Sequence, residues 1–552
     1  MRVRKRKNLP KKNSVLVFLF LLPLIGVGAY ASVLVIILED IGSYNYQIGP
    51  PDTNHFIDKD DIDPDLMADL AGVLNNRLLE YHLPLNLSVT VTFSDYSYET
   101  VADIHETDNA ALYGGETMAA QCFRYATAKK ENNKTEMAHS IQIIKRLVSG
   151  YSLLLAVPNG GIGPEYPGLP ARFYSPPGKE YQEEYPEIFS DHYKMFNGTG
   201  DYKNWRCRLK TSLDEMGGYA VALGMVLKFV DPDDSEVAEW CYERVRVLVA
   251  QLVEGFKKTN WLVLYGDGTP AGSDLNMDIG GGAWKLAFLK LGAIAYPEKY
   301  AQEYAYTYSK ALHSSQVSEG SIWNTIEEYY AFAFSQCLVL SLILNEDNEK
   351  IRDHYIKTYS EGFYGLLKYH RNAFVNSAFL AFMSLMDKDK RERYEDPEYE
   401  FDKVEWDIND QLFRFMDWGN PRGMNLAKEQ WGIRNYNLTQ RPHSTRSTSL
   451  NPDIREKERN PRVKFWREWI DNNIFGSLYA WVKDDLYEME DMYIVPKTVS
   501  ESSAGALIWG SNPFQGEGGD PYENGLQEER GNGFLLPYYL GRYYGFVEGP
   551  SN

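Results

Sequence analysis

The sequence has few cysteines and no closely spaced pair of them. Its 4 cysteines among 552 residues are Cys122, Cys207, Cys241 and Cys337, and none forms a CxxC motif. A structural zinc site, which needs closely spaced ligands, is therefore not expected. Cys122, Cys241 and Cys337 lie in apolar helical patterns, where cysteine usually acts as a small buried hydrophobe. A disulfide between Cys207 and Cys241 stays open, because sequence alone does not decide it.

The chain also lacks an excess of basic residues. It has 57 Lys and Arg against 77 Asp and Glu, which gives a net charge of -20. This balance excludes nucleic acid as a partner, since nucleic-acid binding needs a basic surface to neutralise phosphates. With 44% hydrophobic and 24% charged residues, the composition is that of a globular protein with a sizeable core.

One uncharged stretch, residues 14–38, is long enough to span a bilayer. It follows a basic tail in residues 1–13 that contains Arg2, Arg4, Lys5, Arg6, Lys7, Lys11 and Lys12. Because Lys and Arg stay on the cytoplasmic side, we predict a single-pass cell-membrane protein whose large domain is extracellular. The lipid bilayer is then a partner through residues 14–38. The alternative is a signal peptide cleaved after Ala29-Tyr30-Ala31, which the continuing apolar run disfavours.

Acceptor sequons for N-glycosylation follow this stretch. They begin at Asn86, Asn133, Asn197 and Asn437. On an extracellular domain they are available for modification, which would make the chain a glycoprotein.

From residue 101 onward, helical patterns come in pairs. The expected pairs are Asn109–Lys129 with Glu136–Val157, Ser212–Val230 with Ser235–Lys258, Gly280–Tyr296 with Glu298–His313, Asn324–Leu344 with Asn348–Tyr369, and Asn372–Met386 with a helix near Trp406–Trp418. Short links inside pairs indicate antiparallel neighbours. Their irregular spacing favours a closed toroid of hairpins over a regular solenoid. We therefore predict an all-α toroid over residues 101–552.

A linker and accessory segment, residues 39–100, precedes the predicted toroid. Within it, Pro64–His82 has the pattern of a helix, with Asp63 placed to cap it and Pro64 at its first position. Leu87–Phe93 alternates in the manner of a short strand.

In such a ring, the first helices of all pairs begin on one face. Acidic, amide and aromatic residues gather at these starts: Asp108, Asn109, Asp214, Glu215, Asp274, Asp278, Trp323, Glu327, His370 and Asn372. For any one of them, helix capping is an ordinary explanation. Their convergence predicts a carboxylate-rich mouth, in which neighbouring carboxylates raise one another's pKa.

Paired carboxylates are what glycoside hydrolysis needs. Asp214 or Glu215 is the candidate general acid, Asp274 or Asp278 the base, and Glu327 a further candidate. Sugar platforms are expected from Tyr166, Phe173 and Tyr174, which lie in the long segment Pro158–Arg208. A polysaccharide lyase is the alternative chemistry, with His370, Asn372 and Asn376 in its site.

No cofactor is predicted, although calcium stays open. Asp274, Asn276 and Asp278 alternate like part of an EF-hand loop, followed by Gly280 and Gly281. The loop lacks the final bidentate Glu of that motif.

Four segments resemble a known fold family. Asp108–Ala126, Thr211–Leu223 and Asn260–Gly272 are similar to hairpins of six-hairpin, (α/α)6 glycosidase-like proteins, and Gly510–Gly545 resembles the ending of uncharacterised bacterial and archaeal members. The resemblance covers about residues 100–546 and implies an (α/α)6 toroid. Proteins of this fold include inverting glycosidases, lyases, epimerases and non-catalytic members, and no catalytic signature transfers residue by residue.

The resulting expectation is a membrane-anchored extracellular protein that acts on glycans, in the manner of a glycoside hydrolase. The alternative is a non-catalytic surface protein that binds glycans or supports an envelope layer, with calcium as a possible stabiliser. In the non-catalytic case, the mouth carboxylates would be engaged with helix caps and arginine partners.

Overall fold

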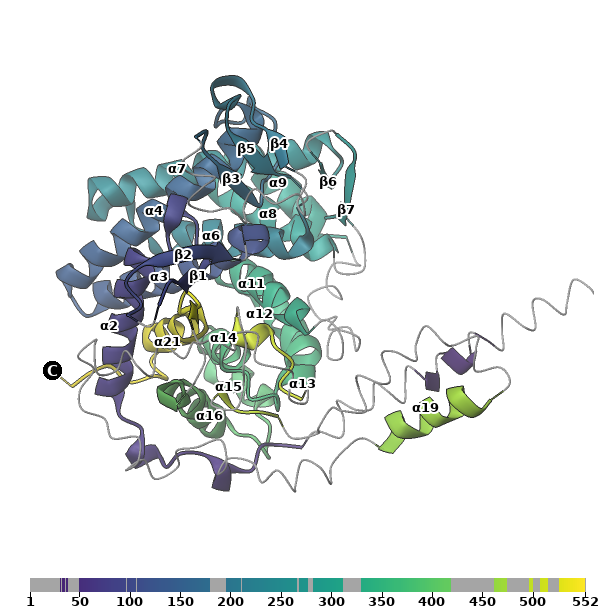
Figure 1. Cartoon of the computed structure of the whole chain (residues 1–552). Coiled ribbons are helices and arrows are strands. Elements are labelled where there is room, and N and C mark those ends of the chain that lie inside the picture. Colours follow the sequence, from purple (N-terminus) through teal and green to yellow (C-terminus); the bar gives the residue numbers. More distant parts are fainter. Residues whose placement is uncertain are drawn as a thin grey trace, which may run out of the picture.

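The computed structural model describes most of the chain from residue 49 to residue 417 and shorter parts of the rest (Figure 1). The described residues are 30, 32–34, 36, 37, 49–95, 97–105, 107–178, 195–209, 211–265, 268–276, 281–310, 329–417, 461–473, 496–499, 507–514 and 526–551. Helices make up most of this structure, and the strands are short. The prediction of a broadly all-α chain is confirmed.

Most helices come in sequential pairs, as the periodicity predicts. The pairs are α3 (Ala110–Lys130) with α4 (Lys134–Asn159), α6 (Leu213–Phe229) with α7 (Glu236–Lys258), α8 (Gly281–Ala295) with α9 (Pro297–Tyr308), α11 (Tyr330–Leu344) with α12 (Glu349–Thr358), and α14 (Ala373–Ser384) with α16 (Phe401–Phe413). Asn133, Ser235 and Asn348 cap the second helix of their pairs by accepting bonds from backbone N–H groups of the first turn. These caps end the connecting turns and start the return helices.

The second helix of the fourth pair is not continuous. The sequence predicts one helix over Asn348–Tyr369, but α12 is followed by a π-helical turn at Tyr359–Phe363 and by α13 (Tyr364–Leu367). The wider turn rotates the residues that follow it. It lets Tyr359, Phe363 and Tyr364 all face the core, where each is buried.

One helix of each pair takes part in a set of helix contacts that is here called the helix circuit. By contact its members follow one another as α3, α6, α11, α14 and α21 (Asn532–Tyr544), which packs back against α3, while α8 packs against both α6 and α11. Segments far apart in sequence therefore lie side by side, as Figure 1 shows for α21 beside α3 and α14. Further contacts join helices that are not in this circuit to it or to one another: α4 packs against α7, α16 against α14, and α2 (Pro64–Glu80) against α21.

The crossing of α3 and α6 is backbone against backbone. A Cβ atom built on Gly115 would lie 2.2 Å from the carbonyl oxygen of Gly218, and one built on Gly218 would lie 2.2 Å from that of Ala111. Both positions therefore require glycine. A Cβ on Gly217 would lie 2.8 Å from the carbonyl oxygen of Phe334 in α11. These contacts hold the N-terminal ends of α3, α6 and α11 together.

The segment before residue 100 packs into the same core. α2 begins at Pro64, and Asp63 caps it by accepting bonds from the N–H groups of Asp65 and Leu66, as predicted. The expected strand forms as β1 (Thr90–Phe93), which lies between β2 (Val101–His105) and β8 (Gln527–Glu528). Arg77 of α2 donates to both carboxylate oxygens of Glu528, at 2.6 and 2.8 Å. The early and late parts of the chain are thereby joined.

The predicted membrane helix, residues 14–38, lies outside the described residues apart from a few between 30 and 37. Among the described helices, α4 is long and apolar enough to cross a membrane, but 72% of its apolar window is buried inside the protein. That burial is typical of a core helix. The N-terminal anchor stays a prediction.

We expect Gly115→Ala to destabilise the protein by about 1–3 kcal/mol, the usual cost of overpacking, because the added methyl group meets backbone. Gly72→Ala is the matched control, since Gly72 also lies in a helix and a Cβ there meets nothing within 4 Å. Denaturant unfolding of the two variants checks this. A loss no larger for Gly115→Ala than for Gly72→Ala would show that the crossing tolerates a side chain.

Candidate functional site

Arg172 joins the N-terminal ends of α3 and α6. Its Nη2 donates to Asn109 Oδ1 at 3.1 Å and to Ser212 Oγ at 3.0 Å. Arg172 Nη2 also lies 3.6 Å from Asp214 Oδ2, and its Nε lies 3.8 Å from Glu215 Oε1. We call Asn109, Arg172, Ser212, Asp214 and Glu215 the Arg172 cluster. Four of these residues come from the two helix starts that the sequence singles out, and Arg172 comes from the long loop between them.

Glu215 caps α3 from the neighbouring helix. Its side chain is fully buried, and Oε2 accepts a hydrogen bond of 3.1 Å from the N–H of Ala111. A carboxyl group at this place also interacts favourably with the dipole of α3. The contact depends on the glycine crossing, which brings the first turn of α6 against the first turn of α3.

Burial raises the pKa of Glu215 well above its ordinary value. Arg172 acts in the opposite direction, while the carboxylates of Asp214 and Asp108 raise the pKa further. Burial dominates because Arg172 Nε, at 3.8 Å from Oε1, is beyond hydrogen-bond distance. Glu215 is therefore a carboxyl group that favours its protonated form, placed beside two further acidic residues.

Two buried tyrosines bond backbone carbonyl groups next to the Arg172 cluster. Tyr151 Oη donates to the carbonyl oxygen of Ala111 at 2.5 Å, and Tyr219 Oη donates to that of Ala171 at 2.8 Å. Their rings pack edge to face, with centroids 5.1 Å apart. Tyr219 thereby fixes the residue next to Arg172, and Tyr151 fixes the residue that Glu215 caps.

The loop that carries Arg172 continues into a small sheet. β5 (Arg206–Arg208) lies between β3 (Phe173–Ser175) and β4 (Met195–Asn197). Phe173 and Tyr174 are buried in it, and Tyr174 Oη donates to the carbonyl oxygen of Leu85. Because both rings are buried, they are not accessible to serve as sugar platforms. Tyr166 is partly exposed.

His370 and Asn372 lie apart from the Arg172 cluster, at the start of α14. His370 is 1% exposed, and its Nδ1 lies 3.1 Å from Tyr329 Oη. Burial lowers the pKa of His370 to about 3, so the ring is neutral at physiological pH. Asn372 caps α14 by accepting from the N–H of Val375, and its Nδ2 donates to the carbonyl oxygen of Trp509 at 3.1 Å.

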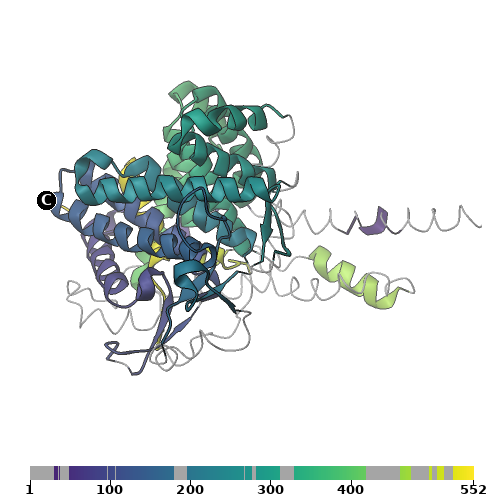
Figure 2. The same ribbon diagram turned by 90° about the horizontal axis from the view of Figure 1, so that it is seen from above.

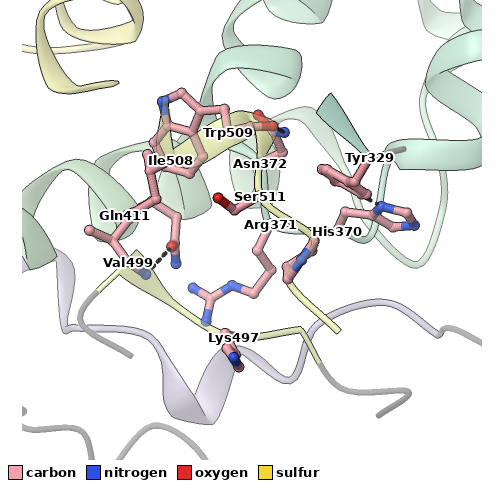
Figure 3. A pocket seen from close by; sticks show the side chains of 11 residues that line it. Tyr329, His370, Arg371, Asn372, Gln411, Lys497, Val499, Ile508, Trp509 and Ser511 are labelled. Atoms are coloured by element: carbon pink, nitrogen blue, oxygen red, sulfur yellow. Dashed lines mark hydrogen bonds between the residues drawn. The ribbon is translucent and has the colours of Figure 1, made fainter. Parts of the chain in front are cut away.

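A cavity of about 20 Å³ adjoins these residues, room for about one water molecule (Figure 3). Its described lining includes Tyr329, His370, Arg371, Asn372, Gln411, Lys497 and Ser511. Arg371 has a φ of 55°, a conformation that costs energy for a residue other than glycine. This cavity is too small for a sugar ring.

Arg371 belongs to a buried ionic network that the sequence does not reveal. Its Nε donates to Asp407 at 2.7 Å and its Nη2 to Asp410 at 2.5 Å. Arg414 Nε also donates to Asp410, at 2.8 Å, and the N–H of Ile57 does so at 2.7 Å. The network ties the segment that follows the predicted anchor to α14 and α16.

The other expected acidic residues are not brought to the Arg172 cluster by any described contact. Asp274 ends β7 (Pro270–Asp274), and its Oδ1 accepts from the N–H of Asn276 at 2.8 Å. Asn276 Oδ1 in turn accepts from Lys285 Nζ at 2.9 Å. Asp278, Trp323 and Glu327 lie outside the described residues.

The described residues contain no group of three or more His, Cys, Asp or Glu side chains placed to hold a metal ion. The expected calcium loop is described only in part, so calcium binding stays a prediction. All four cysteines are buried and free, and Cys207 and Cys241 are not bridged.

An aromatic face at the start of α11 was not expected from the sequence. Tyr330 is 50% exposed, and its ring centroid lies 6.1 Å from that of Phe334. Phe334 lies against Gly217 of α6, which follows Asp214 by one helical turn. The helix α11, which carries this exposed ring, therefore packs against the helix that contributes Asp214 and Glu215. The tyrosine pair at residues 329 and 330 is the sequence signal for this face, but the pattern does not tell which ring is buried.

Comparison of the chain with protein-family models, with curated proteins and with solved structures finds no match. Its function therefore rests on the chemistry of its own residues.

We expect Glu215→Gln to flatten the pH dependence of stability. Because the folded-state pKa of Glu215 is raised above an unfolded-state value of about 4.3, its stabilising effect is complete below that pH and is lost as pH rises through the folded-state pKa. Gln keeps an acceptor for the N–H of Ala111 and does not ionise. Melting temperatures measured from acidic to alkaline pH should therefore fall less for this variant than for the parent. Glu361→Gln, at an exposed glutamate, is the control and should follow the parent curve.

We expect Asp410→Asn to lower the free energy of unfolding by about 3–5 kcal/mol, because the buried guanidinium groups of Arg371 and Arg414 each lose a charged partner. Glu392→Gln, which removes an exposed partner 4.0 Å from Lys388, should cost no more than about 1 kcal/mol. Chemical denaturation compares the two. Equal losses would contradict the importance of the buried network.

Proposed function

We propose that the chain is a membrane-anchored, extracellular glycan-binding protein built as an (α/α)6 toroid. The helix circuit, to which each described helical pair contributes one helix, supports the toroid. In this proposal, α2 and α21 form the sixth helical pair, even though they are far apart in sequence. The binding mouth is the face on which α3, α6 and α11 begin.

The observation that carries the proposal is the packing of α6, which contributes Asp214 and Glu215, against Phe334 of α11, whose ring lies 6.1 Å from the exposed ring of Tyr330. A sugar ring has an apolar face and a polar edge, so it suits a site with an exposed aromatic ring beside fixed hydrogen-bonding groups. Asp214 and Arg172 are partly exposed and supply such groups. The close contact of Gly217 with Phe334 holds the N-terminal ends of α6 and α11 together.

The engagement of the carboxylates favours binding over hydrolysis. A general acid must reach the glycosidic oxygen, and a second carboxylate must act on water or on the sugar. Glu215 is instead fully buried against the first turn of α3, and Asp214 lies beside Arg172. Carboxylates held in helix caps and in arginine contacts are what we expect of a site that binds glycans without cleaving them.

A glycoside hydrolase is the second candidate, and the raised pKa of Glu215 favours it. A protonated carboxyl group beside other carboxylates is the arrangement of a general acid and its partner. In that case, Glu215 would be the acid and Asp274 or Asp278 the base. Glu215 would have to become accessible when substrate binds.

The extracellular location rests on the basic tail and the apolar stretch that follows it. Asn197 agrees with this location, because it begins a sequon and its side chain is exposed on β4. Glycosylation at Asn197 would place the domain outside.

The test is a glycan array together with a reducing-end assay on the full-length chain in detergent. We expect binding without new reducing ends. Tyr330→Ala and Asp214→Asn should each weaken binding by about tenfold, equivalent to about 1.4 kcal/mol. Tyr306→Ala, which removes a tyrosine on α9 that is 62% exposed, should leave binding unchanged.

Equal binding by the Tyr330 and Tyr306 variants would contradict the proposed mouth, and so would the absence of binding. New reducing ends that disappear in Glu215→Gln would establish the hydrolase instead.

A further inference from the structure

The helix α19 (Pro461–Asn472) carries an aromatic face that the main core does not use. Trp466 and Ile470, one turn apart, are buried, yet neither belongs to the core cluster of the helical body. Phe465 and Trp469, also one turn apart, form the flanking stripe. Phe465 is 56% exposed, which leaves a large apolar ring in contact with solvent.

α19 lies outside the helical body. Figures 1 and 2 both draw it beside the described residues between 30 and 37, at the end of the predicted membrane helix. Ile37 is fully buried there and is likewise absent from the core cluster. The two views thus place α19 next to the point at which the chain is predicted to leave the bilayer.

Aromatic side chains at such a place suit the membrane surface. Trp and Tyr are enriched at the headgroup level, because their rings combine an apolar body with a polar edge. A helix with aromatic residues on one side and charged residues on the other lies in the plane of this interface. Going around α19, the side that carries Phe465 and Trp469 is bordered by the side that carries the polar Arg467, Glu468 and Asp471.

We propose that α19 lies on the outer surface of the membrane that holds the N-terminal segment, with Phe465 and Trp469 among the lipid headgroups. This inference rests on the anchor that is part of the proposed function. The occupant of the aromatic stripe is the lipid surface. A second membrane contact limits how the glycan-binding domain swings about its anchor.

The experiment uses the full-length chain reconstituted in vesicles of phosphatidylcholine and phosphatidylglycerol. Phe465→Cys is labelled with an environment-sensitive fluorophore and compared with Tyr306→Cys, an exposed position on α9. The four native cysteines are buried, so they compete little for the label. Fluorescence is then measured with nitroxide-labelled lipid and, separately, with a water-soluble quencher.

We expect the lipid nitroxide to quench the probe at residue 465 several-fold more than the probe at residue 306. Equal lipid quenching at the two positions would overturn the proposal. Protection of residue 465 from both quenchers would also overturn it, because the stripe would then be covered by protein.

An alkaline carbonate wash of the same vesicles tells whether the predicted position of α19 is wrong or the predicted anchor is wrong. Loss of the whole chain in the wash would refute the anchor and, with it, the position of α19. Retention of the chain with no lipid quenching at residue 465 would refute the position of α19 alone. The double variant Phe465→Glu/Trp469→Glu, probed by a label at residue 473, should lose lipid quenching while staying in the membrane.

Discussion

The crossing of α3 and α6 is the contact on which the candidate site depends. Gly115 and Gly218 let the two backbones meet where any side chain would prevent it. The approach puts Glu215 within hydrogen-bond distance of the N–H of Ala111, and it lets one arginine reach Asn109 and Ser212 together. A wider crossing would separate these groups. The contacts of the Arg172 cluster therefore depend on two glycines, Gly115 and Gly218, which let the helices approach closely.

Buried charge in this protein serves mainly to join segments that are distant in sequence. Arg77 and Glu528 connect α2 to β8. Asp410 connects the segment at Ile57 to α14 and α16 through Arg371 and Arg414. Each pair is costly to desolvate, so its members must satisfy one another closely. The same requirement applies to the Arg172 cluster, where Glu215 accepts from the N–H of Ala111 and Asp214 lies 3.6 Å from Arg172.

The helical pairs follow from sequence because their signals are local. The caps at Asp63, Asn133 and Asn348 lie next to the helices that they start, and the apolar periodicity runs through each helix. The π-helical turn at Tyr359–Phe363 escapes this reasoning, since it depends on aromatic rings packing in the finished core.

The site is predictable only in part. Asn109, Asp214 and Glu215 are marked by their positions at helix starts, and the structure does bring them together. Arg172 is a single arginine in a long loop, and its role appears only when two helices meet beside it. Tyr174 is the opposite case: the sequence presents it as an available aromatic residue in a long loop, but its ring is buried and its Oη donates to the carbonyl oxygen of Leu85.

Hydrogen–deuterium exchange of the full-length chain, with and without a captured glycan, tests the central claim most directly. The account predicts that the glycan slows amide exchange at the first turns of α3, α6 and α11 and leaves α9 unchanged. Slowed exchange confined to other segments, with these three helix starts unaffected, would contradict a binding mouth built on the crossing of α3 and α6.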